Sequence, residues 1–324
     1  MKILVTGGAG FIGSNFVRYW LTTHPEDSIV NLDALTYAGN LANLDGLDPQ
    51  RHQFIKGDIC DPIAVHDAME GVDVVVHFAA ESHVDRSIDG SGVFVRTNVI
   101  GTHTLLDEAL RRGDQIKRFH HVSTDEVFGA LALDTEDNFH EQTPYAPRSP
   151  YSASKAASDH LVRAYFHTHQ LPITISNCSN NYGPYHYPEK FIPLMIVNAM
   201  RDIPLPIYGD GLYVRDWIHV DDHCRGIEAI LERGTVGETY CLGGYSEEAN
   251  IDVAKRILAL VGKPESLLKY VEDRKGHDRR YSINDQKAKS QLGWEATVPF
   301  DDGLKLTVEW FQANEGWWRP LLTN

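Results

Sequence analysis

The chain begins with a short apolar run that leads through a glycine-rich turn into a helix-like segment. In KILVTGGAGFIGSNFVRYWLTTH, Gly7, Gly10 and Gly13 are spaced three residues apart at that turn. Glycine there permits a tight turn, lets a ligand approach the backbone and lets the helix pack closely on the strand. The N–H groups and positive dipole end of the helix suit a phosphate group. A glycine triplet can also serve loop geometry alone. The neighbouring residues must therefore decide between a phosphate-binding turn and a purely structural one.

The rest of the first half alternates strand-like runs with helix-length segments. After the first strand, these runs are SIVNLDAL, HQFIKGDI, VDVVVHFAA, FHHVSTDEVFG and LPITISNCSNNYG. Strands that alternate with helices imply right-handed crossovers and a parallel sheet covered on both faces. We therefore predict an α/β fold with a Rossmann-type, doubly wound parallel sheet.

The pattern changes after about residue 180. Prolines interrupt short segments there, and helix-like stretches return at VDDHCRGIEAILERG and NIDVAKRILALVG. We predict a first domain over residues 1–180 and a smaller, mixed α/β C-terminal domain over residues 181–324. Some later segments are expected to interleave with the first domain.

Composition excludes several functional classes. The formal net charge of −15 argues against a broad nucleic-acid surface. No apolar run approaches the roughly 18 residues of a membrane span, and the start MKILVTGG lacks the features of a signal peptide. The 4 cysteines and 16 histidines show no metal-ligand or redox spacing. We predict a cytoplasmic protein with no metal, no nucleic-acid partner and no membrane partner.

An acid at the end of the second strand indicates the cofactor. Asp33 closes IVNLD, where a carboxylate can accept both hydroxyls of an adenosine ribose. No arginine follows to receive a 2′-phosphate, and Asp33 would repel one. Asp58 and Ile59 end the next strand and could hold the adenine edge. This favours NAD over NADP, with a simple capping role for Asp33 as the alternative.

Tyr151 and Lys155 lie four residues apart in SPYSASKAASDHLVRAYF, a segment that starts like a helix. This spacing places both side chains on one helix face, about 6 Å apart along the axis. A phenol with a pKa near 10 needs roughly 4 kcal/mol of help to act as a base at neutral pH. An ammonium and an oxidised nicotinamide have the right sign of charge. Thr124, at the end of the preceding strand, is the expected hydroxyl partner.

These motifs resemble the extended short-chain dehydrogenase/reductase family over essentially the whole chain. The catalytic hydroxyl, tyrosine and lysine of that family match Thr124, Tyr151 and Lys155. The resemblance implies an enzyme with NAD as cofactor. It also implies an NAD-binding Rossmann domain at residues 1–180 and a nucleotide-sugar-binding domain mainly at residues 181–324.

Asp125 and Glu126 directly follow Thr124 in STDEVFG. Epimerases of the family need no further acid–base pair, whereas loss of water needs one proton donor and one acceptor. With NLDALTYAGN, FAAESHVDRS, NCSNNYGPYHYPEKFIPL, VRDWIHVDDH and DRKGHDRRY, the pair resembles the sugar-nucleotide 4,6-dehydratases of that family. The resemblance implies a lyase of deoxysugar biosynthesis, such as that of rhamnose, that converts dTDP-glucose to dTDP-4-keto-6-deoxyglucose and water.

The resemblance also implies a role for each catalytic residue. Tyr151 deprotonates the C4 hydroxyl during oxidation, Glu126 removes the C5 proton, and protonated Asp125 donates to the departing C6 hydroxyl. The hydride taken from C4 returns at C6, so NAD is regenerated in each turnover. The alternative is that the two carboxylates only solvate a turn. Phe128 stands where tyrosine is common, and we expect a packing change there without lost activity.

Two sets of binding residues follow from the same resemblance. Expected NAD contacts are Gly7, Gly10, Phe11, Ile12, Gly13, Asp33, Ala34, Leu35, Thr36, Asp58, Ile59, Ala79, Ala80, Thr97, Tyr151, Lys155 and Asn181. Expected contacts with the nucleotide sugar are Ser82, Thr124, Asn180, Lys190, Phe191, Pro206, Ile207, Tyr208, Arg215, Asn250, Arg274 and His277. Arginine forks suit phosphate oxygens, and tyrosine can stack on a pyrimidine. Arg274 and His277 could instead be surface charges.

Two amphipathic stretches, TNVIGTHTLLDEALRRG and SASKAASDHLVRAYFHTH, have the length of helices. By the resemblance, they pair with their copies in a homodimer through a four-helix bundle. Their apolar faces could equally lie wholly against the sheet. Three other functions stay open: a UDP- or CDP-sugar 4,6-dehydratase, a nucleotide-sugar 4-epimerase and a non-catalytic dinucleotide sensor.

Overall fold

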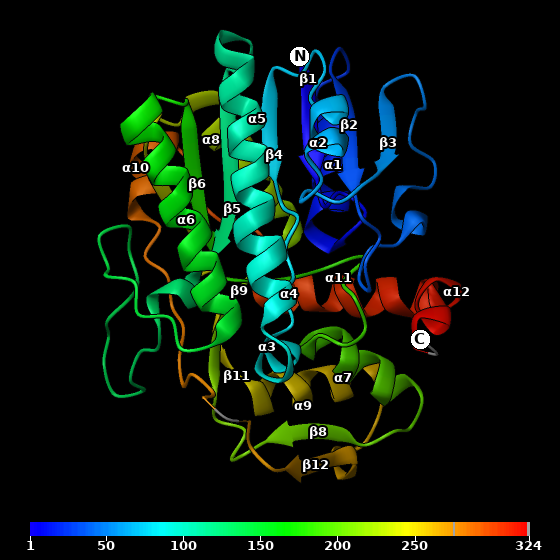
Figure 1. Cartoon of the computed structure of the whole chain (residues 1–324). Helices are drawn as coiled ribbons and strands as arrows, with labels where there is room; N and C mark the ends of the chain where they lie inside the picture. The colour runs from blue at the N-terminus through cyan, green and yellow to red at the C-terminus, as the bar shows by residue number, and fades with distance from the viewer. Residues whose placement is uncertain (275, 323–324) are drawn as a thin grey trace.

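A seven-stranded parallel sheet forms the centre of the computed structural model, which describes residues 1–274 and 276–322 (Figure 1). The strand order is β10-β6-β5-β4-β1-β2-β3. The bounds are β1 (Lys2–Thr6), β2 (Ser28–Asp33), β3 (His52–Lys56), β4 (Val74–His77), β5 (Arg118–Thr124), β6 (Ile173–Cys178) and β10 (Thr239–Leu242). The predicted α/β, Rossmann-type sheet is confirmed.

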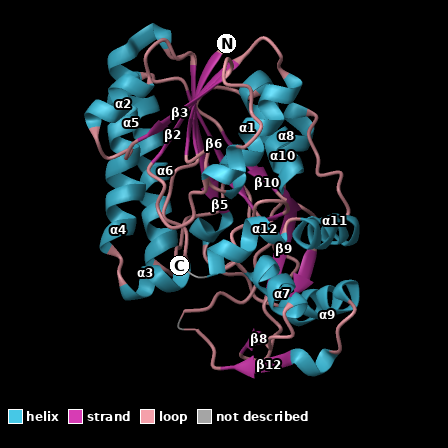
Figure 2. Ribbon diagram, turned by 90° about the vertical axis from the view of Figure 1, so that its right-hand side faces the viewer, coloured by secondary structure: helices cyan, strands magenta, loops and turns pink. Residues whose placement is uncertain are grey.

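Helices cover both faces of this sheet, as the edge-on view in Figure 2 shows. One face carries α1 (Phe11–Thr23), α8 (Val220–Arg233) and α10 (Gln286–Leu292). The other carries α2 (Pro62–Ala68), α5 (Thr102–Arg112) and α6 (Pro150–His169). Every residue of β4 and β6 is buried. Burial on both faces explains why these strands read as continuous runs instead of alternating apolar and polar residues.

The strand order reverses at β1, which pairs with β2 on one side and with β4 on the other. At such a reversal the loops from the carboxyl ends of neighbouring strands turn in opposite directions and leave a crevice for a ligand. The glycine-rich turn after β1 and the ends of β4 and β5 therefore border one crevice. This is where the sequence places its polar motifs.

A smaller mixed lobe lies beyond the carboxyl edge of the sheet (Figure 1). It holds a three-stranded sheet, β11-β9-β7, and a two-stranded sheet, β12-β8. Its strands are β7 (Asn180–Tyr182), β8 (Leu205–Tyr208), β9 (Val214–His219), β11 (Glu247–Ala249) and β12 (Leu268–Val271). Its helices are α7 (Phe191–Met200), α9 (Asn250–Val261), α11 (Phe300–Ala313) and α12 (Glu315–Trp318). The chain returns from this lobe to the main sheet at α8, β10 and α10.

The helix expected near residues 97–113 is interrupted. After α3 (Val84–Asp89) and α4 (Gly92–Phe94), residues Val95–Gly101 form a π-helix, η2, before α5 begins. The widened turn places Asn98 so that it exchanges hydrogen bonds with the backbone of Glu81 and donates to Ser154 on α6. Such π-turns are common beside functional sites. The short 3₁₀ turns are η1 (Leu41–Leu44), η3 (Gly113–Gln115), η4 (Asp125–Phe128), η5 (Glu265–Leu267) and η6 (Arg319–Leu322).

Candidate active site

A cavity of about 490 Å³ runs from the glycine-rich turn into the smaller lobe. All the residues predicted for catalysis, cofactor binding and substrate binding line it, except Leu35, Pro206 and Ile207. The backbone of Leu35 closes a turn by donating to Asp33, and Ile207 is buried in the core of the smaller lobe. Because side chains alternate along β8, Tyr208 reaches the cavity while Ile207 does not.

The glycine-rich turn forms a tight cradle at one end of the cavity. Gly7 has φ +74°, and a Cβ there would lie 2.7 Å from the backbone of Ala79. A Cβ on Gly13 would lie 2.4 Å from the carbonyl oxygen of Gly7. Within the part of the chain that the structure describes, no side chain caps the N-terminus of α1. Its first N–H groups therefore remain available to a phosphate group, as the predicted dinucleotide requires.

Asp33 lies beside this cradle at the end of β2. Its carboxylate accepts hydrogen bonds from the backbone N–H groups of Ala9 at 2.9 Å and Leu35 at 2.8 Å. Burial raises the pKa of Asp33, and these two donors oppose that rise. Each carboxylate oxygen can accept a second hydrogen bond, so the fixed side chain can receive ribose hydroxyls. The cradle and this acid together fit an adenine dinucleotide.

A hydroxyl and two acids meet where β5 ends. Thr124 begins η4, because its Oγ1 accepts a hydrogen bond from the N–H of Glu126 at 3.3 Å. The same hydroxyl donates to Oδ1 of Asp125 at 3.2 Å. It also acts on the phenol of Tyr151, whose pKa it lowers. The adjacent carboxylates thus belong to a capped turn at the carboxyl edge of the sheet, and both line the cavity.

The two acids have different electrostatic surroundings. Asp125 is 1% exposed, and burial, with the charge of Glu126, raises its pKa well above the usual range. Its Oδ2 has no hydrogen-bond partner among the described residues. Burial also raises the pKa of Glu126, but the positive charges of Arg215 and Lys190 oppose the rise. Asp125 is therefore the better proton donor and Glu126 the better base.

Tyr151 and Lys155 lie one turn apart on α6, which starts after a capping box made by Ser149 and Ser152. Burial and the charge of Glu126 raise the pKa of Tyr151 well above its ordinary value, while the Thr124 hydroxyl opposes this rise. The Lys155 ammonium donates to the carbonyl of Val122 at 2.8 Å. The sequence predicted that Lys155 lowers the Tyr151 pKa, whereas in this structure burial outweighs any such effect.

Positive and amide groups gather where the cavity enters the smaller lobe. Arg215 is 9% exposed, and its guanidinium donates to the carbonyls of Val214 at 2.7 Å and Asp278 at 3.0 Å. No ion pair among the described residues joins it to a carboxylate, and its charge opposes the raised pKa of Glu126. The Oδ1 atoms of Asn180 and Asn250 are buried without a partner in the same described set. A buried cation beside unpaired amides suits an anionic, hydroxyl-rich ligand.

The far end of the cavity carries aromatic and basic side chains. The guanidinium of Arg274 lies 5.0 Å from the ring centre of Tyr208, and its Nε is 3.4 Å from the carboxylate of Asp85. His277 stacks on Tyr213 with ring centres 3.6 Å apart. Arg274 and His277 both line the cavity, which favours the binding interpretation over that of free surface charges.

The sequence missed several cavity residues that come from loops. His186 stacks on Phe11 at 4.1 Å, and Glu189 pairs with Arg86 at 2.8 Å. Asp278 accepts a hydrogen bond from Tyr281 at 2.7 Å. All except Arg86 line the cavity. His186 and Glu189 lie in NYGPYHYPEK, and Asp278 and Tyr281 lie in GHDRRY. The motifs therefore indicated the right segments but did not show which of their residues face the cavity.

Phe128 lies outside the cavity lining. It stacks on Phe139 with ring centres 5.2 Å apart and packs edge-on against Tyr145 at 5.3 Å. It is buried in a small cluster behind η4. This packing accords with the expected local effect, and the expectation that activity is retained stays a prediction.

Comparison with known proteins identifies the family. The family described as GDP-mannose 4,6 dehydratase matches residues 4–307. A dTDP-glucose 4,6-dehydratase of Xanthomonas campestris pv. campestris is 54% identical, over 98% of this chain and 95% of the relative. The corresponding enzyme of Neisseria meningitidis serogroup B is 50% identical, over 99% of this chain and 96% of the relative.

Solved structures give the same result. DesIV of Streptomyces venezuelae, a dTDP-glucose 4,6-dehydratase crystallised with NAD and TYD bound, superimposes with a TM-score of 0.95. It is 49% identical and covers 99% of this chain and 100% of its own. A UDP-glucose 4-epimerase of Thermotoga maritima reaches a TM-score of 0.89 at 29% identity. The match covers 97% of this chain and 100% of the epimerase. The chain therefore belongs to the GDP-mannose 4,6 dehydratase family.

Proposed function

We infer that this chain converts dTDP-glucose to dTDP-4-keto-6-deoxyglucose and water, with NAD as its cofactor. One observation carries this proposal: Asp125 and Glu126, with unequal surroundings, face the same cavity as Tyr151 and the dinucleotide cradle. An elimination needs such a pair, whereas a 4-epimerisation does not. Relatives at about 50% identity over their full length are named as dTDP-glucose 4,6-dehydratases, which supports the substrate.

The residues of the cavity divide the chemistry among them. Bound NAD supplies a hydride acceptor at C4, a hydride donor at C6 and a positive charge beside the phenol. Tyr151 takes the proton of the C4 hydroxyl. Glu126 removes the C5 proton, which the neighbouring ketone makes more acidic, and Asp125 protonates the departing C6 hydroxyl. Glu126 then returns its proton to C5.

Two residues end this reaction in the opposite protonation state from the one in which they began. Tyr151 has gained the proton of the C4 hydroxyl, and Asp125 has lost a proton to the released water. Before the next turnover, one proton must pass from Tyr151 to Asp125. The Thr124 hydroxyl donates to the carboxylate of Asp125 and acts on the Tyr151 phenol, whose pKa it lowers. We propose that this hydroxyl relays the proton, accepting it from the phenol and donating its own to the carboxylate.

The proposed function is tested by incubating the purified chain with dTDP-glucose and, separately, with UDP-glucose and CDP-glucose. The alkali-induced absorbance of a 4-keto-6-deoxy sugar is expected from dTDP-glucose. The same product from only one of the other two nucleotides would reassign the base. Conversion of UDP-glucose to a galactosyl nucleotide would indicate an epimerase. Bound NAD without any turnover would indicate a dinucleotide sensor.

Asp33→Asn is expected to weaken NAD binding about tenfold or more, because it removes a charged acceptor for the ribose hydroxyls. Calorimetric titration with NAD and with NADP measures the effect, and the preference for NAD should fall because the amide no longer repels a 2′-phosphate. Asp45→Asn, on the exposed turn after η1 and outside the cavity lining, is the matched control. Unchanged affinities in the Asp33 variant would contradict the assignment.

We also propose that residues 1–180 mainly hold NAD, that residues 181–324 mainly hold the nucleotide sugar, and that the chain forms a homodimer. Both α5 and α6 lie side by side on one face of the sheet (Figure 1). Their inner faces pack on the sheet through residues such as Leu105 and Val162. Apolar side chains on the adjoining turns nevertheless stay exposed, among them Val93 at 48% and Ile100 at 51%. A second copy of the same surface would cover them.

Ile100→Asp is expected to convert the dimer to a monomer, because it places a charge in an apolar interface. Light scattering after size-exclusion chromatography gives the mass. Leu306→Asp on α11, whose side chain is 55% exposed on another face, is the control and should remain dimeric. A monomeric parent chain would contradict the dimer outright, and a dimeric Ile100 variant would place the interface elsewhere.

We propose that the protein is cytoplasmic, because its cysteines form no disulfides in the structure. All four, Cys60, Cys178, Cys224 and Cys241, are unpaired in the structure. Unpaired thiols are typical of reducing compartments. No helix among the described residues combines the length and apolar character that crossing a membrane requires.

A further inference from the structure

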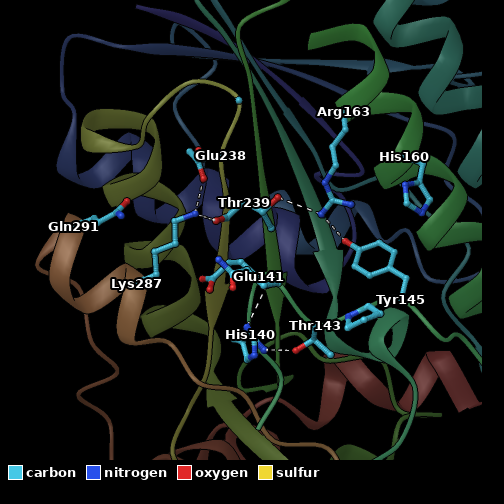
Figure 3. Close-up of a pocket in the computed structure, with 13 residues that line it drawn as sticks. His140, Glu141, Thr143, Tyr145, His160, Arg163, Glu238, Thr239, Lys287 and Gln291 are labelled. Carbon is cyan, nitrogen blue, oxygen red and sulfur yellow. Dashed lines mark hydrogen bonds and ion pairs between the residues drawn. The ribbon is translucent and has the colours of Figure 1, made fainter. Parts of the chain in front are cut away.

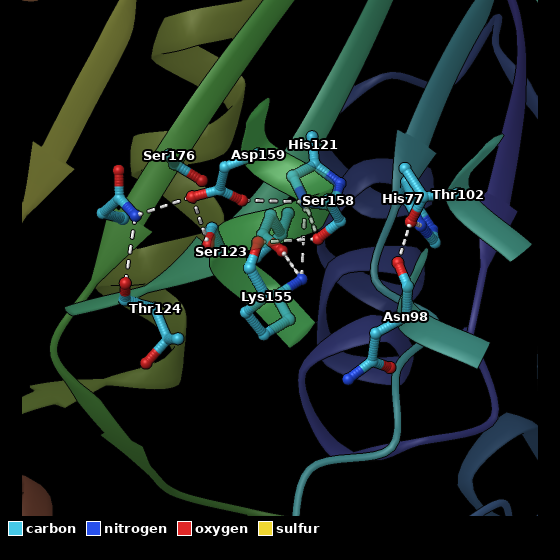
Figure 4. Close-up of polar contacts among 12 residues, drawn as sticks. His77, Asn98, Thr102, His121, Ser123, Thr124, Lys155, Ser158, Asp159 and Ser176 are labelled. Carbon is cyan, nitrogen blue, oxygen red and sulfur yellow. Dashed lines mark hydrogen bonds and ion pairs between the residues drawn. The ribbon is translucent and has the colours of Figure 1, made fainter. Parts of the chain in front are cut away.

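Behind Lys155 lies a buried group of polar and charged side chains that the mechanism does not use (Figure 4). Asp159 follows Lys155 by one turn on α6, and His121 lies on β5; both are 0% exposed. The Lys155 Nζ is 3.5 Å from His121 Nε2, which is 3.1 Å from Asp159 Oδ1. One imidazole nitrogen, His121 Nε2, thus contacts both a buried ammonium and a buried carboxylate.

Asp159 is held as a carboxylate by its hydrogen bonds. Its Oδ2 accepts from the Ser123 hydroxyl at 2.9 Å and from the Tyr145 phenol at 2.7 Å. Burial alone would raise the pKa of Asp159, yet His121, Lys155 and Tyr145 together hold it below the usual value. The protein therefore keeps a negative charge in its interior, which is unfavourable unless a positive charge balances it.

The buried ammonium of Lys155 in turn requires a negative charge nearby to balance its own charge. The titratable groups packed around it are Tyr151 and Asp159 on α6, His121 on β5, His77 on β4 and Cys178 on β6. Burial lowers the pKa of His121 to about 4 and that of His77 well below its ordinary value, and it raises the pKa of the Cys178 thiol to about 12. Both histidines and the thiol are therefore neutral. Burial also lowers the pKa of Lys155, and the charge of Asp159 opposes that change.

A second cavity, of about 840 Å³, is lined by Tyr145 and Arg163 (Figure 3). Arg163 donates to the Tyr145 oxygen at 2.8 Å, and the phenol in turn donates to Asp159. Tyr145 thus stands between Arg163 and the carboxylate, whereas Lys155 and Asp159 share a contact with His121 Nε2.

We propose that Asp159 is a positioning residue of this active site: across His121, it keeps the catalytic ammonium charged and directed toward β5 and the cofactor side of the cavity. The two opposite charges meet at one nitrogen of the neutral imidazole. Removing either charge leaves the other buried alone. The effect on turnover rests on the proposed function, whereas the coupling between the two charges does not.

The first test is the pH dependence of kcat/KM. An ammonium is present below its pKa and lost as the pH rises through it, so loss of Lys155 charge limits activity on the alkaline side. Asp159→Asn should move this alkaline limb to lower pH by about one unit or more, the shift typical of a nearby opposite charge. Ser123→Ala, which removes a hydrogen bond to Asp159 and leaves both charges, should not move it. An unmoved limb in the Asp159 variant would overturn the proposal.

The second test measures stability in place of turnover. Urea unfolding of the full chain is compared for Lys155→Met, Asp159→Asn and the double variant. Each single variant should lower the unfolding midpoint, and the double variant should regain part of that loss because it buries no lone charge. The coupling would be overturned if the double variant had a urea midpoint no higher than that of the less stable single variant. Failure of all three variants to fold would overturn it as well. If the parent makes no 4-keto product, only the proposed function fails.

Discussion

Glu126→Gln is expected to oxidise C4 of the sugar and then stall, because an amide cannot remove the C5 proton. Turnover should fall about 10²- to 10⁴-fold, the contribution of a positioned acid–base group. Tyr151 and Thr124 remain in place, so the first step continues. Absorbance of reduced nicotinamide should therefore build up on mixing with dTDP-glucose, while the 4-keto-6-deoxy product forms slowly.

Asp125→Asn is the matched control for this prediction. It removes the proton donor for the leaving hydroxyl and leaves the base intact. In deuterated water, hydrogen exchange at C5 should continue in the Asp125 variant and cease in the Glu126 variant. Full turnover by Glu126→Gln, or C5 exchange at the parent rate, would show that another group is the base.

The sheet could be predicted because its strands are buried on both faces and its first turn is rich in glycine. Those signals are local: β1, β4 and β5 each read as an apolar run that ends in polar residues. The edge strand β10 gave no such signal, since TYCL is four residues long and joins the sheet only through its pairing with β6. The π-helix at residues 95–101 was also missed, because it depends on contacts of Asn98 with Glu81 and Ser154.

The catalytic part of the site could be predicted because reactive residue types occur at positions that the fold brings together. Thr124, Asp125 and Glu126 follow a strand, and Tyr151 and Lys155 keep helical spacing, so one edge of the sheet had to collect them. The ionisation of these groups was less predictable. The raised pKa of Tyr151 arises from burial and from Glu126, which only the folded chain brings together.

Asp159 shows the same limit on prediction from sequence. Its helical spacing from Lys155 is visible in the sequence, but its link through His121 requires β5 to pack beneath α6. Helical spacing alone could not distinguish a buried counter-charge from an ordinary surface acid.

Thr124→Val is expected to lower steady-state turnover about 100-fold, because it removes the hydroxyl that donates to Asp125 and acts on the Tyr151 phenol. The first turnover should be affected less than later ones, since the resting enzyme has time to adjust both protonation states with solvent. Rapid quenching should reveal a burst of about one product per active site, followed by a slow phase. That slow phase should be slower still in deuterated water, because it depends on proton transfer.

Thr124→Ser keeps the hydroxyl and should restore turnover to within a few-fold of the parent, without a burst. The comparison separates two roles of one side chain. If Thr124 only supports the phenol during C4 oxidation, the valine variant should lose its first turnover and its later turnovers equally. If the hydroxyl also carries the proton back to Asp125, only the later turnovers should lag. Equal losses, with no burst at any enzyme concentration, would contradict proton return through Thr124 and leave solvent as the route by which Asp125 regains its proton.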